Sequence, residues 1–273
     1  MTTPASIMLV LTLFLISGLY CVEGFGPTER ASPHSALRRG LRYYCGPVST
    51  SDSNAAIPRH IAFIVDGNGR WATEKGLPRS QGHSEGASTT VEIAKHLLKM
   101  DGIEALTFYL FSSENWSRPV EEIDNIMRLL ERYLMEVSAY LMENKIKLVV
   151  IGELERLPVT SQALIQTIEA STAVFDGQGA GGTAKTLVLA LSYGGRWDVL
   201  NAVKSLAKNK KGDLTKLTEE DFGKHLSLGS RGIPDPDVLV RTSGEKRLSN
   251  CLLWQISYAE IFFLESKWPD LTV

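Results

Sequence analysis

The residues best suited to chemistry are a carboxylate, two glycines and an arginine that lie close together in Asp66–Arg70. The apolar, β-branched run His60–Val65 precedes them and is typical of a buried strand. Ligands of a parallel sheet bind beyond the carboxyl ends of its strands, so Asp66 lies where a reaction would be placed. Glycines let backbone N–H groups approach an anion closely. We interpret this stretch as a phosphate or diphosphate cradle with a metal-binding or proton-handling carboxylate at its rim.

Arginine recurs in three further segments, each of which follows a predicted strand: Ser112–Arg118, Tyr193–Asp198 and Arg241–Asn250. Arg79 and His83 come between the first cluster and the next predicted helix. A guanidinium group can bind two phosphate oxygens at once, through charge-assisted hydrogen bonds. Because the loops that follow parallel strands meet at one edge of the sheet, these segments predict one shared phosphate site.

The elements that must position these residues alternate along the chain. Runs rich in apolar and β-branched residues predict strands at His60–Val65, Glu104–Leu110, Ile146–Ile151, Thr186–Leu191 and, more briefly, Val238–Val240. Helical spacing of apolar residues predicts helices at Gly86–Met100, Pro119–Asn144, Leu157–Val174, Arg196–Lys208 and Thr218–Leu226. This alternation predicts an α/β fold built on a parallel sheet with right-handed crossovers.

The predicted helix Pro119–Asn144 has the clearest pattern. Ser117 can cap it, and Glu121 and Glu122 suit the positive end of its dipole. Apolar residues then recur at helical spacing as a broad stripe along its length. Such a stripe fits ordinary core packing, which is the default interpretation.

Composition excludes several classes of protein. The chain has 273 residues, 44% of them hydrophobic, which is enough for a buried core. Its formal net charge of −2 gives no electrostatic case for a nucleic acid partner. The three cysteines, Cys21, Cys45 and Cys251, are too few and too scattered for a disulfide framework or a zinc site.

The first 57 residues resemble a targeting leader rather than part of the fold. Residues 7–20 form an apolar run of the length of a signal-peptide core, shorter than a membrane span, and we predict a signal peptide over residues 1–24. Residues 25–57 are basic and then rich in serine, which predicts a transit peptide and linker. This two-part leader resembles those of algal plastid proteins. The alternatives are a signal-anchor with a disordered tail and association with the endoplasmic reticulum membrane. The folded domain is predicted at residues 58–273.

A competing motif also starts at Gly67. Residues 67–72 match the dinucleotide pattern G-x-G-x-x-A after a strand. The acid that binds the ribose should follow about 20 residues later, at the end of a second strand. That distance falls within the predicted helix Gly86–Met100, and the next strand ends at Leu110 without an acid. A dinucleotide-binding oxidoreductase is therefore the weaker interpretation.

Taken together, the clusters resemble the signature blocks of the cis-prenyltransferases, a family that includes undecaprenyl and dehydrodolichyl diphosphate synthases. The blocks, in order, are His60–Ala72 with Arg79 and His83, Phe111–Trp116, Tyr193–Asp198, and Arg241–Asn250 with Leu252–Glu260. The likeness runs from about Pro58 to Asp270. It implies a single domain with a central, mostly parallel sheet flanked by helices, and an apolar tunnel between the sheet and two helices.

The resemblance also implies an activity and a set of site residues. Isopentenyl diphosphate would be added in cis geometry to an allylic diphosphate, such as farnesyl or geranyl diphosphate, to make a membrane lipid precursor. Asp66 and Asn115 would be catalytic, and Asp66 and Glu260 would bind Mg²⁺. The implied substrate-binding residues are Gly67, Asn68, Gly69, Arg70, Trp71, Arg79 and His83 near the allylic diphosphate, Ser112, Trp116 and Arg118 on a closing loop, and Arg241, Arg247 and Ser249 for isopentenyl diphosphate.

Two further observations bear on that resemblance. The chain contains no Asp-Asp pair, whereas the trans-prenyltransferases rely on Asp-rich motifs for the same chemistry. The family also implies a homodimer or heterodimer, and some eukaryotic members are non-catalytic partner subunits. Such partners typically lose the aspartate and the glycine-rich loop, which are both present here at Asp66–Arg70.

Overall fold

The computed structural model describes residues 57–176, 185–209 and 214–273. The chain divides into two units, Met1–Ala56 and Ile57–Val273, and the second carries the fold described here. The predicted signal peptide (1–24) and nearly all of the predicted transit peptide and linker (25–57) lie outside the described residues. Within the described ranges, no helix combines the length and the apolar composition needed to cross a membrane.

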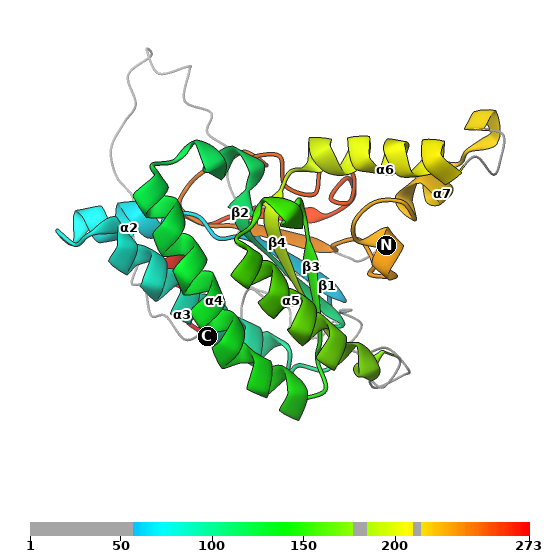
Figure 1. Cartoon of the computed structure of the whole chain (residues 1–273). Helices are drawn as coiled ribbons and strands as arrows, with labels where there is room; N and C mark the ends of the chain where they lie inside the picture. The colour runs from blue at the N-terminus through cyan, green and yellow to red at the C-terminus, as the bar shows by residue number, and fades with distance from the viewer. Residues whose placement is uncertain (1–56, 177–184, 210–213) are drawn as a thin grey trace, which may run out of the picture. The chain divides into compact units, whose positions relative to one another are not determined.

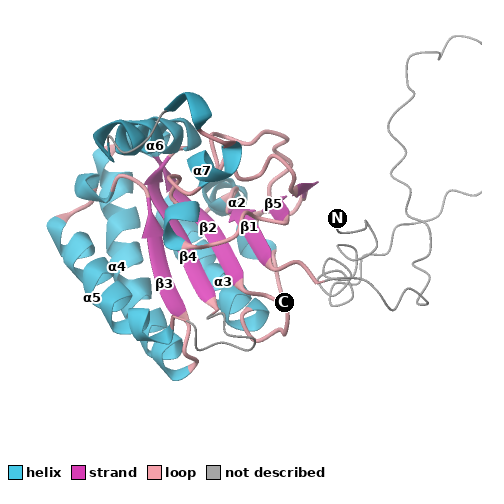
Figure 2. Cartoon of the chain, turned by 90° about the vertical axis from the view of Figure 1, so that its right-hand side faces the viewer, coloured by secondary structure: helices cyan, strands magenta, loops and turns pink. Residues whose placement is uncertain are grey.

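A six-stranded sheet forms the centre of the fold, with the strand order β3-β4-β2-β1-β5-β6 (Figure 2). All five neighbouring pairs are parallel, which confirms the predicted α/β architecture. The strands are β1 (His60–Ile64), β2 (Ala105–Ser112), β3 (Lys147–Ile151), β4 (Thr186–Tyr193), β5 (Val238–Arg241) and β6 (Glu260–Phe263). Five of them match predicted strands, and β6 was not predicted.

Helices connect the strands and cover the sheet (Figure 1). They are α2 (Asn68–Glu74), α3 (Arg79–Leu97), α4 (Val120–Glu143), α5 (Val159–Thr172), α6 (Gly195–Asn209) and α7 (Glu219–Gly223), with short 3-10 turns η1 (Ser113–Ser117), η2 (Leu154–Arg156), η3 (Ala173–Phe175), η5 (Leu214–Lys216), η6 (Gly229–Arg231) and η7 (Trp268–Asp270). The prediction of a loop after Asp66 was wrong, because α2 forms there. The start predicted for the next helix was also wrong, because α3 begins at Arg79, directly after Pro78, and not at Gly86.

Helices α3, α4 and α5 pack side by side, with α4 in contact with both neighbours. Helix α3 also contacts β2, and α5 contacts β3, so these helices cover one face of the sheet. Figures 1 and 2 both show α4 in the middle of this layer. The space between α3, α4 and the sheet is therefore bounded by two helices and two inner strands.

The centre of the sheet is closed by an aromatic cluster that includes a residue from the C-terminal segment. Phe63 stacks on Phe108 with ring centroids 5.1 Å apart, and the fully buried Trp268 meets both rings edge-on at 5.7 and 6.0 Å. The Trp268 indole N–H donates to the Gly86 carbonyl at 2.8 Å and to Thr90 Oγ1 at 3.0 Å. Turn η7 is thereby fastened to α3 beneath the carboxyl edge of the sheet.

A buried histidine holds the opposite, amino edge. His60 is fully buried, with Nδ1 2.6 Å from the Pro234 carbonyl and Nε2 2.7 Å from Thr107 Oγ1. Burial lowers the pKa of His60 to about 4, although the Pro234 carbonyl acts in the other direction. The imidazole is therefore neutral at pH 7 and joins β1 to its neighbours.

Candidate active site

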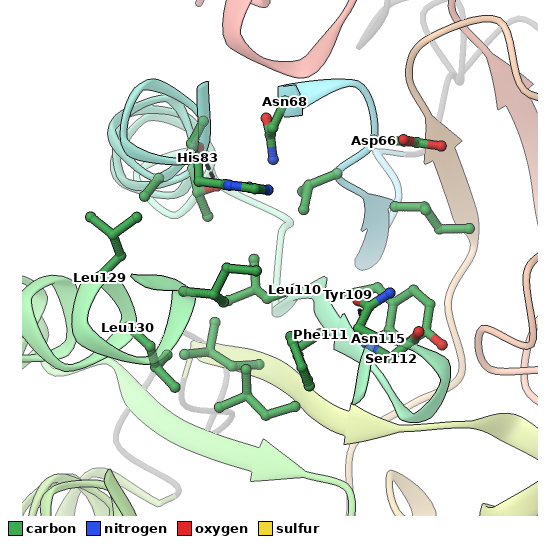
Figure 3. Close-up of a pocket in the computed structure, with 18 of the residues that line it drawn as sticks. Asp66, Asn68, His83, Tyr109, Leu110, Phe111, Ser112, Asn115, Leu129 and Leu130 are labelled. Carbon is green, nitrogen blue, oxygen red and sulfur yellow. Dashed lines mark hydrogen bonds between the residues drawn. The ribbon is translucent and has the colours of Figure 1, made fainter. Parts of the chain in front are cut away.

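The carboxyl ends of the strands open into a cavity of about 670 Å³ (Figure 3). The cavity brings together most of the residues predicted as site residues: Asp66, Gly67, Asn68, Gly69, Arg70, Arg79, His83, Ser112, Asn115, Arg118, Arg241, Arg247 and Ser249. They come from β1, α2, α3, β2, η1, β5 and the loops beside them. Among the described residues, Trp71, Trp116 and Glu260 were also predicted for the site but do not line this cavity.

The backbone of Asp66 is fixed by Thr242, which is fully buried at the end of the neighbouring strand β5. Thr242 Oγ1 accepts from the Asp66 N–H at 3.1 Å and donates to the Asp66 carbonyl at 2.7 Å. The Asp66 N–H also donates to the Ile64 carbonyl, and the Asp66 carbonyl accepts the Trp268 N–H. A single hydroxyl therefore clamps both backbone groups of the residue that begins the site.

The Asp66 carboxylate is held by a buried arginine. Arg241 is 3% exposed and donates from Nη2 to Asp66 Oδ2 at 2.8 Å, while the Gly67 N–H donates to Oδ1 at 2.7 Å. Burial acts to raise the pKa of Asp66, but the hydrogen bond and charge of Arg241, helped by Gly67 and Arg70, outweigh it and leave the pKa below its ordinary value. Asp66 is therefore ionised at neutral pH.

Glycines determine how α2 approaches α3. Gly67 has φ of 102°, a left-handed conformation that glycine adopts without strain, and it turns the chain from β1 into α2. On α3, a Cβ atom at Gly82 would lie 2.1 Å from the Asn68 carbonyl oxygen, and one at Gly86 would lie 2.2 Å from Asn68 Oδ1. Both positions must therefore be glycine for Asn68 to reach the cavity wall, where Figure 3 shows it beside His83.

A second carboxylate connects two of the predicted arginines. Glu245 accepts from Arg70 Nη1 at 2.8 Å and also pairs with Arg247. Arg241 continues the network by donating from Nη1 to Ser249 Oγ at 2.6 Å. The glycine-rich α2 side of the cavity and the Arg241–Asn250 loop are thus connected through Glu245, which was not predicted as a site residue.

A third carboxylate, Glu122 on the first turn of α4, meets two arginines and a histidine. Its Oε1 lies 2.9 Å from Arg118 Nη1, 3.5 Å from Arg79 Nη2 and 3.7 Å from His83 Nε2. Sequence reasoning assigned Glu122 to the helix dipole alone. The spacing of four residues between Arg118 and Glu122 was a signal for one of these pairs, since such residues can meet on a helix.

The segment after β2 folds as the tight turn η1. Asn115 Oδ1 accepts the Ser112 N–H at 3.1 Å, so these two predicted residues support each other at the cavity wall. Figure 3 shows both on the β2 side of the cavity. Trp116 instead packs on Phe111, with centroids 5.0 Å apart, and donates to Ser192 Oγ at 2.9 Å. Trp116 therefore attaches the turn η1 to β2 and β4 and does not contact the cavity.

Trp71, from α2, also has a structural position. Its indole N–H donates to Asp270 Oδ1 at 2.6 Å, and Lys75 Nζ lies 3.9 Å from its ring centroid. The hydrogen bond to Asp270 attaches α2 to η7. Trp71 thus stabilises the helix that carries the cradle and does not itself contact the cavity.

The predicted Tyr193–Asp198 segment belongs mostly to the core. Asp198 is buried and accepts hydrogen bonds from the Tyr193 hydroxyl at 2.8 Å, from Gln255 Nε2 at 2.9 Å and from the Ser227 N–H and hydroxyl. Arg196 is exposed and, of the described residues, is not one that lines the cavity. This segment therefore holds the start of α6 in place.

The structure does not bring Glu260 to Asp66 within one chain. Glu260 is the first residue of β6 and lies level with Val238 on β5 and Ile61 on β1, toward the amino edge of the sheet. From Ile64 at the carboxyl end of β1, it is displaced by about 10 Å along the strands and about 10 Å across them. The implied pairing of the two carboxylates on one metal ion is thus not supported within a single chain, because parallel strands place the start of β6 away from the end of β1.

Beyond its polar mouth the cavity is apolar. It continues between α3, α4 and the strands β2 and β4, where its lining includes Ala87, Val91, Ala94, Leu110, Ile126, Met127, Leu130, Leu134, Val137, Leu187 and Leu189. Leu129 and Leu130 of α4 face this part in Figure 3. The predicted tunnel between the sheet and two helices is confirmed. The apolar stripe on α4 contributes both to the tunnel lining and to the core, since Leu134 lines the cavity and Leu141 lies in the core.

Comparisons with known proteins agree with this geometry. A family model described as putative undecaprenyl diphosphate synthase matches residues 64–273. An isoprenyl transferase of Neisseria gonorrhoeae is 42% identical over 217 residues, which cover 80% of this chain and 82% of that protein. The ditrans,polycis-undecaprenyl-diphosphate synthase ((2E,6E)-farnesyl-diphosphate specific) of Micrococcus luteus is 40% identical over 228 residues, 82% of this chain and 87% of that protein.

Among solved structures, lavandulyl diphosphate synthase from Lavandula x intermedia, in complex with dimethylallyl diphosphate, superposes with a TM-score of 0.73. It is 30% identical, and the match covers 79% of this chain and 90% of that one. The residues that the family model matches include all those that line the described cavity. The chain belongs to the undecaprenyl diphosphate synthase family of cis-prenyltransferases.

Proposed function

We propose that this protein condenses isopentenyl diphosphate with an allylic diphosphate to give a cis-polyprenyl diphosphate, with release of diphosphate. The observation that carries the proposal is the arrangement of two arginine groups around Asp66 at the mouth of an apolar tunnel. Cationic groups on two sides suit two diphosphates, and the tunnel suits a growing hydrocarbon chain.

The two substrates are assigned by their position relative to the tunnel. Asn68, Arg79 and His83 lie beside α3, which forms a tunnel wall, so they suit the allylic diphosphate whose hydrocarbon enters the tunnel. Arg241, Arg247 and Ser249 lie on the β5 side and suit isopentenyl diphosphate. The farnesyl specificity in the name of the Micrococcus luteus relative supports an allylic primer of similar kind.

The chain's own residues supply charge where the reaction needs it. As the bond to the departing diphosphate breaks, negative charge builds on its oxygens, and the fixed cations stabilise that charge more than they stabilise the substrate. Asp66, ionised and clamped by Thr242 and Arg241, lies between the two groups. Ser112 and Asn115 bound the site on its β2 side.

We propose Mg²⁺ as the metal that accompanies the substrates. Mg²⁺ is commonly held by one or two carboxylates together with substrate phosphates, so the Asp66 carboxylate, 29% exposed at the cavity, fits this role. Within the described residues no cluster of three or more acidic, histidine or cysteine side chains could hold a metal by itself, which agrees with binding that depends on diphosphate. When bound, the ion would neutralise charge on the leaving group.

We also propose that the protein works as a dimer, with an identical or a related subunit. In the described part of the fold β6 is an edge strand, and Ile261 and Trp254 are partly exposed beside the 98% exposed Tyr258. An open edge with exposed aromatic residues is a surface that soluble proteins usually cover. Measuring the molar mass of the purified protein by light scattering, with and without Tyr258→Glu, tests this proposal. A monomer in both cases would contradict it.

For location, we propose import into a plastid, supported by the composition of residues 1–57. A fluorescent protein fused after residue 57 tests the proposal, and reticular rather than plastid fluorescence would favour the endoplasmic reticulum. The product there would be a membrane lipid precursor, dolichol-like or shorter, whose length is set by the tunnel.

The central experiment is to replace Asp66 with alanine. Turnover with farnesyl diphosphate, Mg²⁺ and labelled isopentenyl diphosphate should fall by about 10²–10³, since a contact at the developing charge is lost. Asp101→Ala, an exposed acid on another turn, is the control and should keep normal activity. Near-normal turnover by Asp66→Ala would refute the assignment, and an inactive wild-type protein that activates a second subunit would favour the non-catalytic role.

A further inference from the structure

We infer that Glu122 is a positioning residue whose carboxylate competes with the allylic diphosphate for two arginines and a histidine and so keeps binding at that subsite reversible. The inference rests on the proposed function and deepens it. Nothing in the sequence patterns that pointed to the site included Glu122, whose contacts cross between α3 and the start of α4.

The geometry places the carboxylate behind the cations. Arg79, His83 and Arg118 all line the cavity, whereas Glu122, 16% exposed, is not among the described residues that do. All three contacts converge on one oxygen, Oε1, at 2.9, 3.5 and 3.7 Å. These three side chains therefore lie between Glu122 and the space that a diphosphate would enter. Either the carboxylate or the diphosphate can bind them.

The positive charge around Glu122 exceeds its negative charge, so this wall of the cavity can still attract an anion. Burial lowers the pKa of His83, the charges of Arg118 and Arg79 lower it further, and Glu122 opposes them, so the imidazole is neutral at pH 7. One carboxylate then faces two guanidinium groups, with a net charge of about +1. The surplus positive charge leaves this side of the cavity able to bind an anionic ligand.

Partial neutralisation has a consequence for repeated addition. After each condensation the diphosphate of the lengthened product must leave one subsite and occupy the other before another unit is added. Binding that stabilises substrate and transition state equally does not speed the chemical step, and binding that is too tight slows release. A built-in counter-anion lowers the affinity of the subsite without removing the cations.

Glu122→Gln is the direct test, because glutamine keeps the shape and one acceptor oxygen but removes the negative charge. Binding of farnesyl diphosphate, measured by calorimetry without isopentenyl diphosphate, should become about tenfold tighter. The KM for the allylic substrate should fall with it, and kcat should fall because product release slows. A merely structural role would lower stability without tightening binding.

Glu121→Gln is the matched control, since Glu121 is the preceding residue, is exposed and forms no ion pair with any described residue. It changes the net charge equally and should leave binding unchanged. Glu122→Asp, which keeps the charge but draws it away from the cations, should fall between wild type and Glu122→Gln and serves if the glutamine variant does not fold. Unchanged or weaker binding in the folded variants would overturn the inference. If wild type neither binds farnesyl diphosphate nor turns over, the proposed function fails instead.

Discussion

Replacing Thr242 with valine tests whether the backbone of Asp66 must be held for catalysis. Valine has the shape of threonine but removes the hydroxyl that accepts the Asp66 N–H and donates to the Asp66 carbonyl. Each such bond contributes about 1 kcal/mol. Both Asp66 groups keep another partner, since the N–H still meets the Ile64 carbonyl and the carbonyl still meets the Trp268 N–H. The expected loss of stability is therefore about 1–2 kcal/mol, not the larger cost of a buried group left unsatisfied.

For a domain of this size that loss corresponds to a fall in Tm of about 3–6 °C. The effect on turnover should be larger, because misplacing a catalytic group by about 1 Å can lower the rate by about 100-fold. Differential scanning calorimetry and steady-state kinetics on the same protein separate the two quantities. Thr242→Ser keeps the hydroxyl and is the control, with kcat close to wild type. Wild-type kcat in Thr242→Val, together with a lowered Tm, would refute the reasoning that Thr242 positions Asp66.

Two further predictions concern His60 and Gly86, which lie away from the Asp66 carboxylate. His60 stays neutral in the fold with a pKa near 4. The unfolded chain binds the extra proton below about pH 6.5, so the free energy of unfolding should fall by about 3 kcal/mol between pH 6.5 and 4. Urea unfolding at several pH values would show this slope, and an equal slope in His60→Gln would contradict it. Gly86→Ala places a Cβ 2.2 Å from Asn68 Oδ1, so it should raise the KM for the allylic substrate and lower the free energy of unfolding by about 1–3 kcal/mol. Gly223→Ala is the control, because nothing lies within 4 Å of a Cβ there. An equal response in both variants would argue against the packing role of Gly86.

The sequence was sufficient to predict the first four strands and the longer helices. Strands β1 to β4 are continuous apolar runs, as strands covered on both faces must be, and each was predicted within a few residues of its bounds. The helix α2 was missed because Gly67 and Gly69 read as a loop, whereas Gly67 only supplies the left-handed turn that starts the helix. Strand β6 was missed because its four residues begin with an exposed glutamate and are only partly buried.

The site was predicted better for its cations than for their partners. The arginines follow strands and therefore stand out in the sequence. Glu245 and Arg70 are 175 positions apart in the sequence, and Glu122 and Arg79 are 43 positions apart. Neither contact therefore follows from local spacing. The placement of Glu260 also needed the sheet order, because only the register of β5 and β6 shows that it lies toward the other edge.

The position of Trp268 has a consequence for how the protein is made. Its indole bonds the Gly86 carbonyl, 182 positions earlier, and its backbone N–H holds the carbonyl of Asp66. At ribosomal rates of about 5–20 residues per second, Trp268 emerges about 10–40 s after the helix it fastens. Until then Phe63 and Phe108 lack the ring that covers them, and the nascent chain presents an apolar surface that chaperones recognise. A chain that ends before residue 268 would therefore lack one hydrogen bond to the Asp66 carbonyl and would leave the rings of Phe63 and Phe108 uncovered.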